Sequence, residues 1–579
     1  MAMIPIAPDG AAIRAAFLAD ERATVAARAA LATGSDDAAV AAQARAWVAG
    51  VRERSGGSTG VESLLQQYDL STQEGVLLMC VAEALLRIPD AATADRLIRD
   101  KLARGDWERH LGASDSLLVN ASTWGLMLTG KLTSIDVDAA RDPASWYERL
   151  VARAGEPVVR VALRQAMKVM AEQFVMGRTI GEALTRARSG EHARYRFSYD
   201  MLGESALTAG DAGRYHAAYA EAIAAIGDRA QDPHAPVFAQ PSISVKLSAL
   251  HPRYEYAQRK RVFEELVPTI VDLAQRAAVR GIGFTIDAEE AERLELSLEL
   301  IARVRRDPAL SGWHGFGLAV QAYQKRALAV VEWIAALARE TKHRIPVRLV
   351  KGAYWDTEVK RAQVQGLAGY PVFTRKAHTD VSYLACARRL LEAGDAVYPM
   401  FATHNAHTIA WVAECAARVG VSEFEFQRLH GMGEALYAQV TAPPHGHACR
   451  VYAPVGSHQD LLPYLVRRLL ENGANTSFVN RIADPAVSID EVVAHPVSRA
   501  QEHGHTPSPR VPLPADLFGA ERRNSAGVSL ADQPAMREFD TALAASATAR
   551  RRDWPAHDRR SQRRRRQRGR AHGDDRTGR

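Results

Sequence analysis

The pattern of apolar and polar positions changes character near residue 240. Residues 1 to about 200 are rich in alanine and carry apolar side chains at helical spacing, as in AAIRAAFLADERATVAARAAL, with few strand signals. From about residue 240, short runs rich in Val, Ile and Phe alternate with helical stretches. This alternation predicts parallel strands separated by helices. The runs expected to form strands are SISVKL at 242, FTID at 284, LAVQA at 318, VRLVK at 347, YPMFATHN at 398, FEFQRL at 424 and CRVYAP at 449.

Seven such runs approach the eight strands of a closed (β/α)8 barrel, a fold of about 250 residues. The eighth strand is not evident in the sequence. The predicted fold class is α/β, a distorted (β/α)8 barrel preceded by an all-α arm and helical domains. The predicted boundaries are 1–90 for the helical arm, 91–200 for a helical α-domain, 201–485 for the barrel, 486–549 for an extended linker rich in Pro and polar residues, and 550–579 for an Arg-rich tail.

The net charge of +7 comes almost entirely from the tail. Residues 550–579 hold 13 Arg, no Lys and 4 Asp, whereas the remaining 549 residues carry 61 basic and 63 acidic side chains. A sequence such as SQRRRRQRGR is typical of a disordered segment that binds polyanions without sequence preference. Arginine without lysine is also what a shifted reading frame in GC-rich DNA produces, and we favour this second explanation.

Several protein classes are not indicated. The four cysteines, Cys80, Cys386, Cys415 and Cys449, form no CxxC pair, which argues against a disulfide framework or a structural zinc site. The N-terminus has no basic segment ahead of an apolar core, and no run of 18 apolar residues occurs. We therefore expect a protein of the reducing cytoplasm.

Polar side chains lie within the predicted strands or at their carboxyl ends, where the active sites of (β/α)8 barrels are found. Each has a structural alternative: Asp287 could cap a helix, Gln321 could bond inside the barrel, and His404 could be a satisfied buried histidine. Seven in succession favour a site. They are Lys246, Asp287, Gln321, Arg348 with Lys351, the run Thr403-His404-Asn405, Gln427 with His430, and Tyr452.

The segment from Tyr464 to Glu471 has a polar face and an apolar face if it is helical. Tyr464, Arg467, Arg468 and Glu471 stand at i, i+3, i+4 and i+7, and Leu and Val fill the other side. Two adjacent guanidiniums suit a small carboxylate ligand, because arginine presents paired N–H donors. The alternative is a solvated helix face with ordinary ion pairs. Pro463 indicates that the helix begins or kinks there.

Several chemistries are compatible with these residues to different degrees. His404 and His407 lack a well-spaced acidic partner, so no metal site is expected. Lys246 or Lys351 could form the Schiff base of a lyase. No G-x-G-x-x-G run is complete, which argues against a Rossmann dinucleotide site. A flavin at the barrel mouth remains open, with Arg348 and Lys351 at its pyrophosphate, Gln321 and Asn405 at its ring edge or ribityl chain, and Trp355 at an aromatic face.

Long collinear segments resemble one family, the flavin-dependent proline dehydrogenase domain of the bacterial proline utilization A proteins. The resemblance covers at least residues 199–482, and the helical region before it fits the family's arm and α-domain more loosely. The segments are YDMLGESALT (199–208), SISVKLSALHPRYE (242–255), RLVKGAYWD (348–356), ATHNAHT (402–408), FEFQRLHGMGEALY (424–437) and YAPVGSHQDLLPYLVRRLLENGANTSFVNR (452–481).

The resemblance implies a site for L-proline and a site for FAD. Arg467 and Arg468 would pair with the substrate carboxylate, Lys246 and Asp200 would complete the polar end, and Tyr354 would pack the ring. The other implied substrate-binding residues are Tyr452, Tyr464 and Leu429 against the pyrrolidine ring, Glu204 as a gate that pairs with Arg467, and Glu471, which would steady both arginines. For FAD, the matching positions are Asp287, Gln321, Arg348, Val350, Lys351, Gly352, Trp355, Thr403, His404, Asn405 and Ser477.

The implied reaction is hydride transfer from C5 of proline to N5 of the flavin, giving Δ1-pyrroline-5-carboxylate, the first step from proline to glutamate. A membrane quinone would reoxidise the reduced FAD. The implied location is the cytoplasm, and the resemblance leaves open peripheral contact with the inner membrane face and a homo-oligomer.

Two parts of the larger family are not expected here. Full-length members continue into an NAD-dependent aldehyde dehydrogenase, and this chain stops where that domain should begin, so we expect the second activity to be absent. Some members begin with a ribbon-helix-helix DNA-binding segment, which the N-terminus does not resemble, so no specific nucleic acid is expected as a partner. The alternatives to a proline dehydrogenase are another barrel enzyme, such as a Schiff-base lyase, and a DNA-binding regulator whose case rests on the basic tail.

The implied carboxylate site leads to a first prediction. We expect Arg468→Met to raise the Michaelis constant for proline strongly while leaving the flavin bound, because the arginine orients the substrate and the cofactor carries the chemistry. Steady-state kinetics on the purified variant measure this effect. An unchanged Michaelis constant would remove Arg468 from the carboxylate role.

Overall fold

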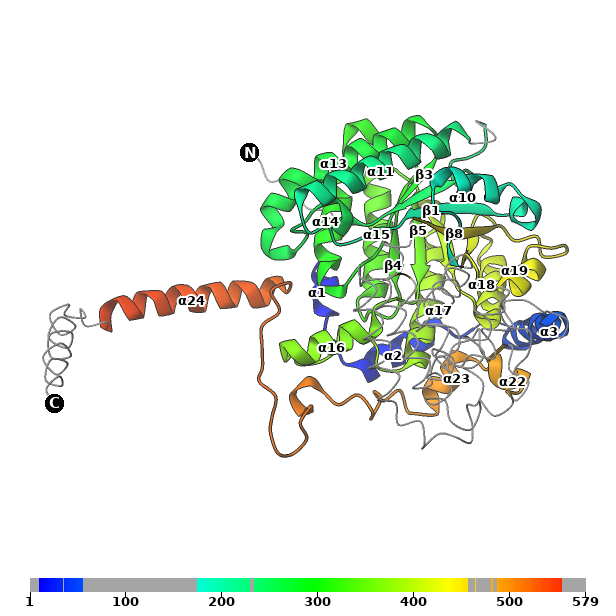
Figure 1. Ribbon diagram of the computed structural model, residues 1–579. Helices are drawn as coiled ribbons and strands as arrows, with labels where there is room; N and C mark the ends of the chain where they lie inside the picture. Colours follow the sequence, from blue (N-terminus) through cyan, green and yellow to red (C-terminus); the bar gives the residue numbers. More distant parts are fainter. Residues whose placement is uncertain are drawn as a thin grey trace, which may run out of the picture.

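Eight parallel strands pair in sequence order and close a barrel in the computed structural model of the chain (Figure 1). The structure describes residues 10–34, 36–55, 174–229, 234–456, 464, 481–482 and 487–553. The strands are β1 (Arg196–Met201), β2 (Ser242–Val245), β3 (Gly283–Ile286), β4 (Phe316–Gln321), β5 (Ile345–Val350), β6 (Val397–Ala402), β7 (Glu425–Leu429) and β8 (Cys449–Val455). The predicted α/β barrel is therefore confirmed.

The strand that sequence analysis missed is the first one, β1, with the sequence RFSYDM. It pairs with β2 through Ser198↔Ser242 and with β8 through Ser198↔Tyr452, so it closes the barrel. Every second residue is polar, because Ser198 and Asp200 face the barrel interior while Phe197 and Tyr199 pack in the surrounding apolar core. The predicted barrel boundary at 201 is wrong, since it cut off this strand.

Helices on the outside of the barrel follow the strands in turn (Figure 1). Their apolar residues recur at helical spacing, as in α13, where Val262, Leu266, Ile270 and Leu273 are buried toward the barrel. Local sequence sets several ends: Thr208 and Asp211 form a capping box on α11. These helices are α11 (Ala209–Asp228), α12 (Leu247–Leu250), α13 (Arg259–Val279), α14 (Leu294–Arg305), α15 (Ala327–Thr341), α16 (Trp355–Gln365), α17 (Lys376–Glu392), α18 (Ala406–Val419) and α19 (Glu434–Val440).

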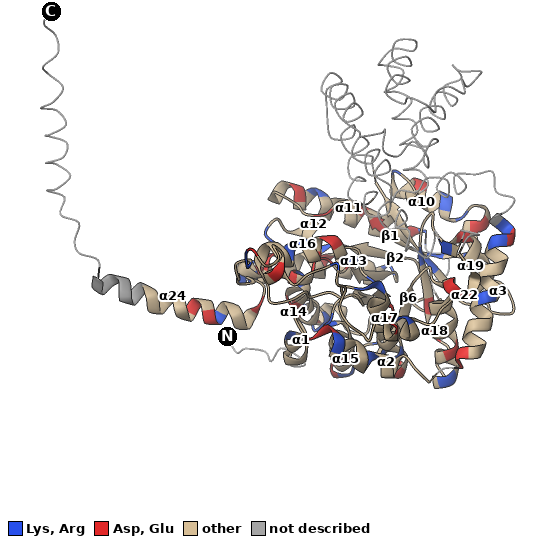
Figure 2. Cartoon of the chain, turned by 90° about the horizontal axis from the view of Figure 1, so that it is seen from below, with Lys and Arg blue, Asp and Glu red and all other residues tan. Residues whose placement is uncertain are grey.

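Short 3-10 helices and one further α-helix complete the barrel domain. The α-helix, α10 (Ile180–Ala187), precedes β1 and is capped by Thr179. The 3-10 helices are η3 (Gly190–Arg194), η4 (Tyr256–Gln258), η5 (Ala291–Arg293), η6 (Pro308–Leu310) and η7 (Gly394–Ala396). Lys and Arg are interspersed with Asp and Glu over these elements (Figure 2), which agrees with the nearly neutral charge of the chain ahead of its tail.

The N-terminal segment attaches to the barrel through buried charges. It forms α1 (Ala11–Ala15), α2 (Glu21–Leu31) and α3 (Asp37–Ser55). From α2, the carboxylate of Glu21 accepts hydrogen bonds from the backbone N–H of Thr374 at 3.0 Å and lies 2.6 Å from Nδ1 of His378. Arg28 donates to Oγ of Ser382 at 2.5 Å and to backbone carbonyls of residues 324 and 325. These hydrogen bonds of two buried charged side chains anchor the arm beside the start of α17.

The segment after residue 486 contains helices, so the predicted extended linker over 486–549 is wrong in part. It forms α22 (Ile489–Val492), α23 (Pro496–Gln501), η8 (Pro514–Asp516) and α24 (Gln533–Asp553). Figure 1 shows α24 projecting away from the barrel. Its sequence is rich in the strong helix formers Ala and Arg, which the composition of the preceding Pro-rich stretch obscured. The helix also takes in the start of the predicted tail, and residues 554–579 lie outside the described residues.

No helix in the described residues is both long and apolar enough to cross a membrane. Within the same part of the chain, no group of three or more His, Cys, Asp or Glu side chains is placed to hold a metal ion. Cys386, Cys415 and Cys449 are buried free thiols, and Cys80 lies outside the described residues.

His407 on α18 leads to a prediction about pH and stability. Its ring packs edge-on against His495 at 5.0 Å, and burial, followed by the charge of His495, lowers its pKa to about 3. Asp37, Asp380 and Arg499 are the other charged groups acting on it. In the unfolded chain a histidine titrates near pH 6.5, so between pH 6.5 and about 3 the unfolded state binds a proton that the folded state does not. The free energy of unfolding therefore falls as pH falls, by up to about 1.4 kcal/mol per pH unit.

We expect His407→Asn, whose side chain does not titrate, to flatten the fall of the urea unfolding midpoint between pH 6.5 and 4. The wild-type protein measured at the same pH values is the control. Equal slopes in the two proteins would show that His407 is not held neutral in the folded state.

Candidate active site

An ionic cluster lies where the first three strands end. Nζ of Lys246, directly after β2, is 2.7 and 2.8 Å from the two carboxylate oxygens of Asp200 on β1 and 3.7 Å from Oδ2 of Asp287, directly after β3. The parallel register brings these positions together, since Asp200 pairs with Ser244 and Ile286 pairs with Val245. Lys246 and Asp200 are buried, so their charges depend on each other.

The charge states in this cluster follow from burial and from the neighbouring charges. Burial raises the pKa of Asp200, an effect that the Lys246 ammonium opposes. Burial alone would lower the pKa of Lys246, but the carboxylates of Asp200 and Asp287 outweigh it and raise that pKa well above the usual value. Lys246 therefore stays a charged ammonium. A Schiff-base nucleophile must be a neutral amine, so this geometry counts against the lyase alternative for Lys246.

Arg348 and Tyr452 complete the cluster through Asp287. The guanidinium of Arg348 donates to Oδ1 of Asp287 at 2.7 Å, and the hydroxyl of Tyr452 donates to Oδ2 at 2.7 Å. The guanidinium also lies 5.2 Å from the centre of the Tyr452 ring. Burial, followed by Asp200 and Asp287, raises the pKa of Tyr452 well above its usual value, so its hydroxyl remains a donor. Asp287 caps no helix, contrary to the structural alternative for it.

Gln321, at the end of β4, forms a hydrogen bond through only one of its two amide atoms among the described residues. Its Nε2 donates to the backbone carbonyl of Glu289 at 2.8 Å, while its Oε1 is buried and has no hydrogen-bond partner among the described residues. A buried acceptor without a donor is costly, so this oxygen is suited to a ligand N–H. Gln321 is the last residue of β4, so it lies at the same end of the barrel as the ionic cluster.

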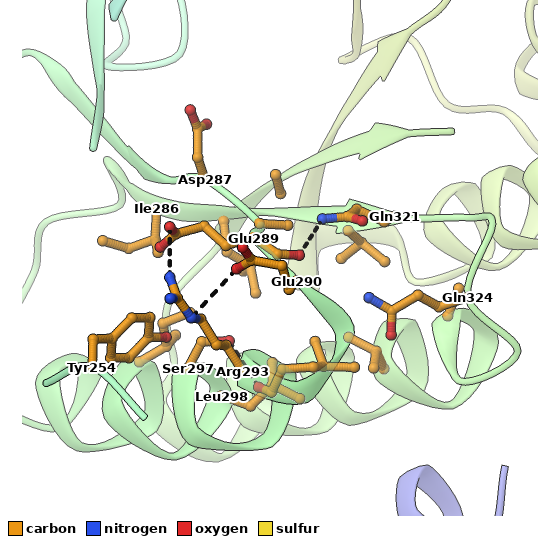
Figure 3. A pocket seen from close by; sticks show the side chains of 18 residues that line it. Tyr254, Ile286, Asp287, Glu289, Glu290, Arg293, Ser297, Leu298, Gln321 and Gln324 are labelled. Atoms are coloured by element: carbon orange, nitrogen blue, oxygen red, sulfur yellow. Dashed lines mark hydrogen bonds and ion pairs between the residues drawn. The ribbon is translucent and has the colours of Figure 1, made fainter. Parts of the chain in front are cut away.

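A pocket between β3, β4 and the helices outside them adjoins the cluster and shares Asp287 and Gln321 with it (Figure 3). Three of its charged groups are paired with each other, because Arg293 forms ion pairs with Glu289 at 3.2 Å and Glu290 at 3.3 Å. In Figure 3, Asp287 points away from the Arg293 side of the pocket. Most other lining residues are apolar, and we interpret this pocket as a gap behind the site.

The loops after β5 and β6 bring further predicted cofactor residues to the same end of the barrel. Val350 ends β5, and Lys351 forms an ion pair with Asp380. Gly352 has φ +136°, and a Cβ there would lie 2.5 Å from the ring of Tyr323, so this position requires glycine. Trp355 starts α16 and donates from Nε1 to the carbonyl of residue 373 at 2.8 Å.

The run Thr403-His404-Asn405 after β6 also has structural roles. Asn405 caps α18 by accepting from the backbone N–H of Thr408 at 3.1 Å, and Oγ1 of Thr403 accepts from the N–H of Asn405 at 3.1 Å. Nε2 of His404 accepts from the N–H of Leu429 at 3.2 Å. These bonds fix the loop at the carboxyl end of β6.

An apolar wall adjoins the ionic cluster. Leu429 and Tyr452 pack against a small cluster that contains Tyr464 and is separate from the main core; its other members are Phe174, Val175, Leu202 and Met432. Tyr354 and Glu204 are half-buried in the loops after β5 and β1. Arg467, Arg468, Glu471 and Ser477 lie outside the described residues, so their predicted roles stay predictions.

Sequence analysis overlooked the polar residues deeper in the barrel. Ser198 and Ser244 are hydrogen-bonded to each other at 3.0 Å, and both accept from Arg348. Glu425 and Arg450 form a fully buried ion pair with N–O distances of 2.6 and 3.1 Å. The signal was the alternation of polar residues along β1, β2 and β7, which predicts that one face of each strand turns toward a polar interior.

Comparison with known proteins matches two family profiles to the chain. Residues 183–481, just over half of the chain, match a family described as proline dehydrogenase, and residues 60–174 match one described as the DNA-binding domain of proline dehydrogenase. The second match counts against the expectation of no specific nucleic acid, which considered only a ribbon-helix-helix segment. Residues 60–173 lie outside the described residues.

Individual relatives agree with the first profile. The bifunctional protein PutA of Escherichia coli (strain K12) is 52% identical over 507 residues, which are 86% of this chain and 38% of that protein. A proline dehydrogenase of Deinococcus radiodurans is 28% identical over 58% of this chain and 96% of its own length. A crystal structure of proline utilization A from Bradyrhizobium japonicum has a TM-score of 0.71 and 51% identity, covering 91% of this chain and 52% of that one. The chain thus spans less than half the length of the Escherichia coli relative.

The buried pair of Lys246 and Asp200 leads to a prediction about coupling. We expect Asp200→Asn and Lys246→Met each to lower the free energy of unfolding by about 3 kcal/mol, because each leaves one buried charge without its closest partner. The double variant should lose much less than the sum, since it removes both charges. Urea unfolding of the four proteins measures this coupling. Additive losses would show that the two side chains do not depend on each other.

Proposed function

Because the chain belongs to the proline dehydrogenase family, we propose that it oxidises L-proline to Δ1-pyrroline-5-carboxylate with FAD as its cofactor. The observation that supports this most directly is the barrel mouth, where a fixed set of buried charges adjoins an apolar wall. Proline has the same division, with a charged end and an apolar ring. A site with only one of these features would not orient the substrate.

The proposed substrate site uses both features. Leu429, Tyr452 and Tyr464 would pack against the methylenes of the pyrrolidine ring and exclude water from it. Arg467 and Arg468 would bind the carboxylate through paired N–H donors. Lys246, held as an ammonium by Asp200 and Asp287, would complete the polar end of the site.

The residues at the mouth fit a flavin. The buried Oε1 of Gln321 offers an acceptor for a ring N–H, and Arg348 and Lys351 offer positive charge for ring carbonyls and pyrophosphate. The absence of a side chain at Gly352 leaves backbone groups open to close approach. Trp355, Thr403, His404 and Asn405 would border the rest of the cofactor. When bound, FAD would supply the hydride acceptor for the oxidation of proline at C5, and a quinone would serve as the final electron acceptor.

The chain's own residues supply orientation and electrostatics. Arg348 and Lys246 are fixed cations in a buried site, so they stabilise negative charge that develops beside them without reorganising. The apolar wall excludes water, which strengthens these interactions. The protein is therefore expected to position the substrate ring against the cofactor, and the positioning accounts for much of the rate.

The test is the visible absorption spectrum of the purified protein, loaded with FAD, before and after anaerobic addition of L-proline. We expect flavin bands that bleach with proline and return when a soluble quinone analogue is added. Flavin bands that do not bleach would contradict proline as the substrate. A folded protein that binds no FAD would overturn the proposal, and trapping of a carbonyl substrate by borohydride would then favour the lyase.

A further inference from the structure

A chain of hydrogen bonds crosses the barrel interior from the amino ends of the strands to the mouth. It begins at Arg450 near the start of β8, which donates to the backbone carbonyls of residues 197, 238 and 240 at 3.2, 2.6 and 2.8 Å. Arg450 also binds Glu425, the first residue of β7, through both carboxylate oxygens. Arg196 binds the same carboxylate at 3.1 Å. Glu425 is therefore fixed by groups that are themselves tied to the backbone.

Gln427 connects the Glu425–Arg450 ion pair to the site at the mouth. Its Nε2 donates to Oε1 of Glu425 at 2.8 Å, and its Oε1 accepts from Nε of Arg348 at 2.7 Å. The reverse orientation of the amide would turn its NH2 group toward a guanidinium and its oxygen toward a carboxylate. Only the observed orientation satisfies both neighbours. Gln427 is buried, so water does not replace either bond.

All three nitrogens of the Arg348 guanidinium donate hydrogen bonds. Gln427 holds Nε, Ser198 and Ser244 hold the terminal nitrogens at 2.9 and 3.0 Å, and Asp287 accepts at 2.7 Å on the side of the mouth. Strands β1 and β5 are not neighbours in the barrel, so the bond to Ser198 crosses the interior. Gln427 is the partner that connects Arg348 to the fixed ion pair below.

We propose that Gln427 is a positioning residue that holds the guanidinium of Arg348 in the orientation required at the cofactor site. This inference rests on the proposed function, because it assigns Arg348 to FAD. Gln427 itself lies below Arg348 and acts through it. Without the amide, Nε of Arg348 loses its acceptor in a buried site, and the guanidinium can rotate toward the remaining partners.

The experiment compares Gln427→Met with the wild-type protein. Methionine keeps the length and nearly the volume of glutamine but makes neither bond. We expect the FAD dissociation constant, measured by flavin fluorescence, to rise about tenfold and kcat to fall about tenfold, the loss typical of one buried charge-assisted hydrogen bond. The Michaelis constant for proline should change less than about twofold, since other residues bind the substrate.

Gln439→Met on α19 is the matched control. Gln439 also makes two hydrogen bonds through its amide, because its Nε2 donates to the carbonyls of residues 47 and 435 at 3.1 and 3.3 Å, but it lies outside the barrel and bonds to no charged group among the described residues. FAD affinity and kcat should stay at the wild-type level in this variant. Equal losses in both variants would overturn the proposal, because they would indicate general destabilisation, and so would wild-type FAD affinity and kcat in Gln427→Met.

If Gln427→Met does not fold, a variant that exchanges the carboxylate of Glu425 and the amide of Gln427 tests the proposal. In the double variant Gln427→Glu with Glu425→Gln, the carboxylate accepts from Arg348 directly, and the amide donates to it while accepting from Arg450. We expect this variant to bind FAD more tightly than Gln427→Glu alone. A folded double variant without FAD affinity would overturn the proposal. A wild-type protein that binds no FAD would instead contradict the proposed function.

Discussion

The need to pair every charge inside the barrel governs this structure. A single unpaired charge in such an interior costs several kcal/mol, yet the interior contains Arg348, Asp287, Glu425 and Arg450. Each arginine therefore meets a carboxylate, and the amide and hydroxyl groups between them complete the hydrogen bonds. Since these partners come from different strands, the network holds only when the barrel is closed. The charged site and the fold thus depend on each other.

This constraint accounts for the properties of the mouth. The uppermost members of the network are held in place by hydrogen bonds and ion pairs to one another; they are Lys246, Asp200, Asp287, Arg348 and Tyr452. The apolar wall beside them is separate from the main core, so the same end of the barrel offers a charged surface and a dry one. On the outside, Glu21 from the arm and Ser508 from the C-terminal segment both bond to Thr374. Residue 373, directly before Thr374, provides the carbonyl that accepts from Trp355. The arm and the C-terminal segment therefore support the loop that holds Trp355.

Most of the barrel is predictable from the sequence, and the prediction fails where polar residues interrupt the apolar pattern. Seven strands were found because their outward residues are apolar and their neighbours are helices. β1 was missed because half of its side chains belong to the polar interior, and α24 was missed because a Pro-rich stretch precedes it. At the site, the polar positions at the strand ends were predicted, whereas Ser198, Glu425 and Arg450 were overlooked because they lie below the mouth. The resemblance to one family supplied roles that spacing alone left open.

The sequence by itself determined the alternation of strands and helices, the polar face of each strand and the family of the chain. Those properties are local or collinear, so they can be read along the chain. Only the tertiary structure decided which polar groups pair, such as Arg348 with Ser198 across the interior and Gln427 between Glu425 and Arg348. The physical reason is that hydrogen bonds and ion pairs depend on distance in space. Closure of the barrel brings residues 150 positions apart within 2.9 Å.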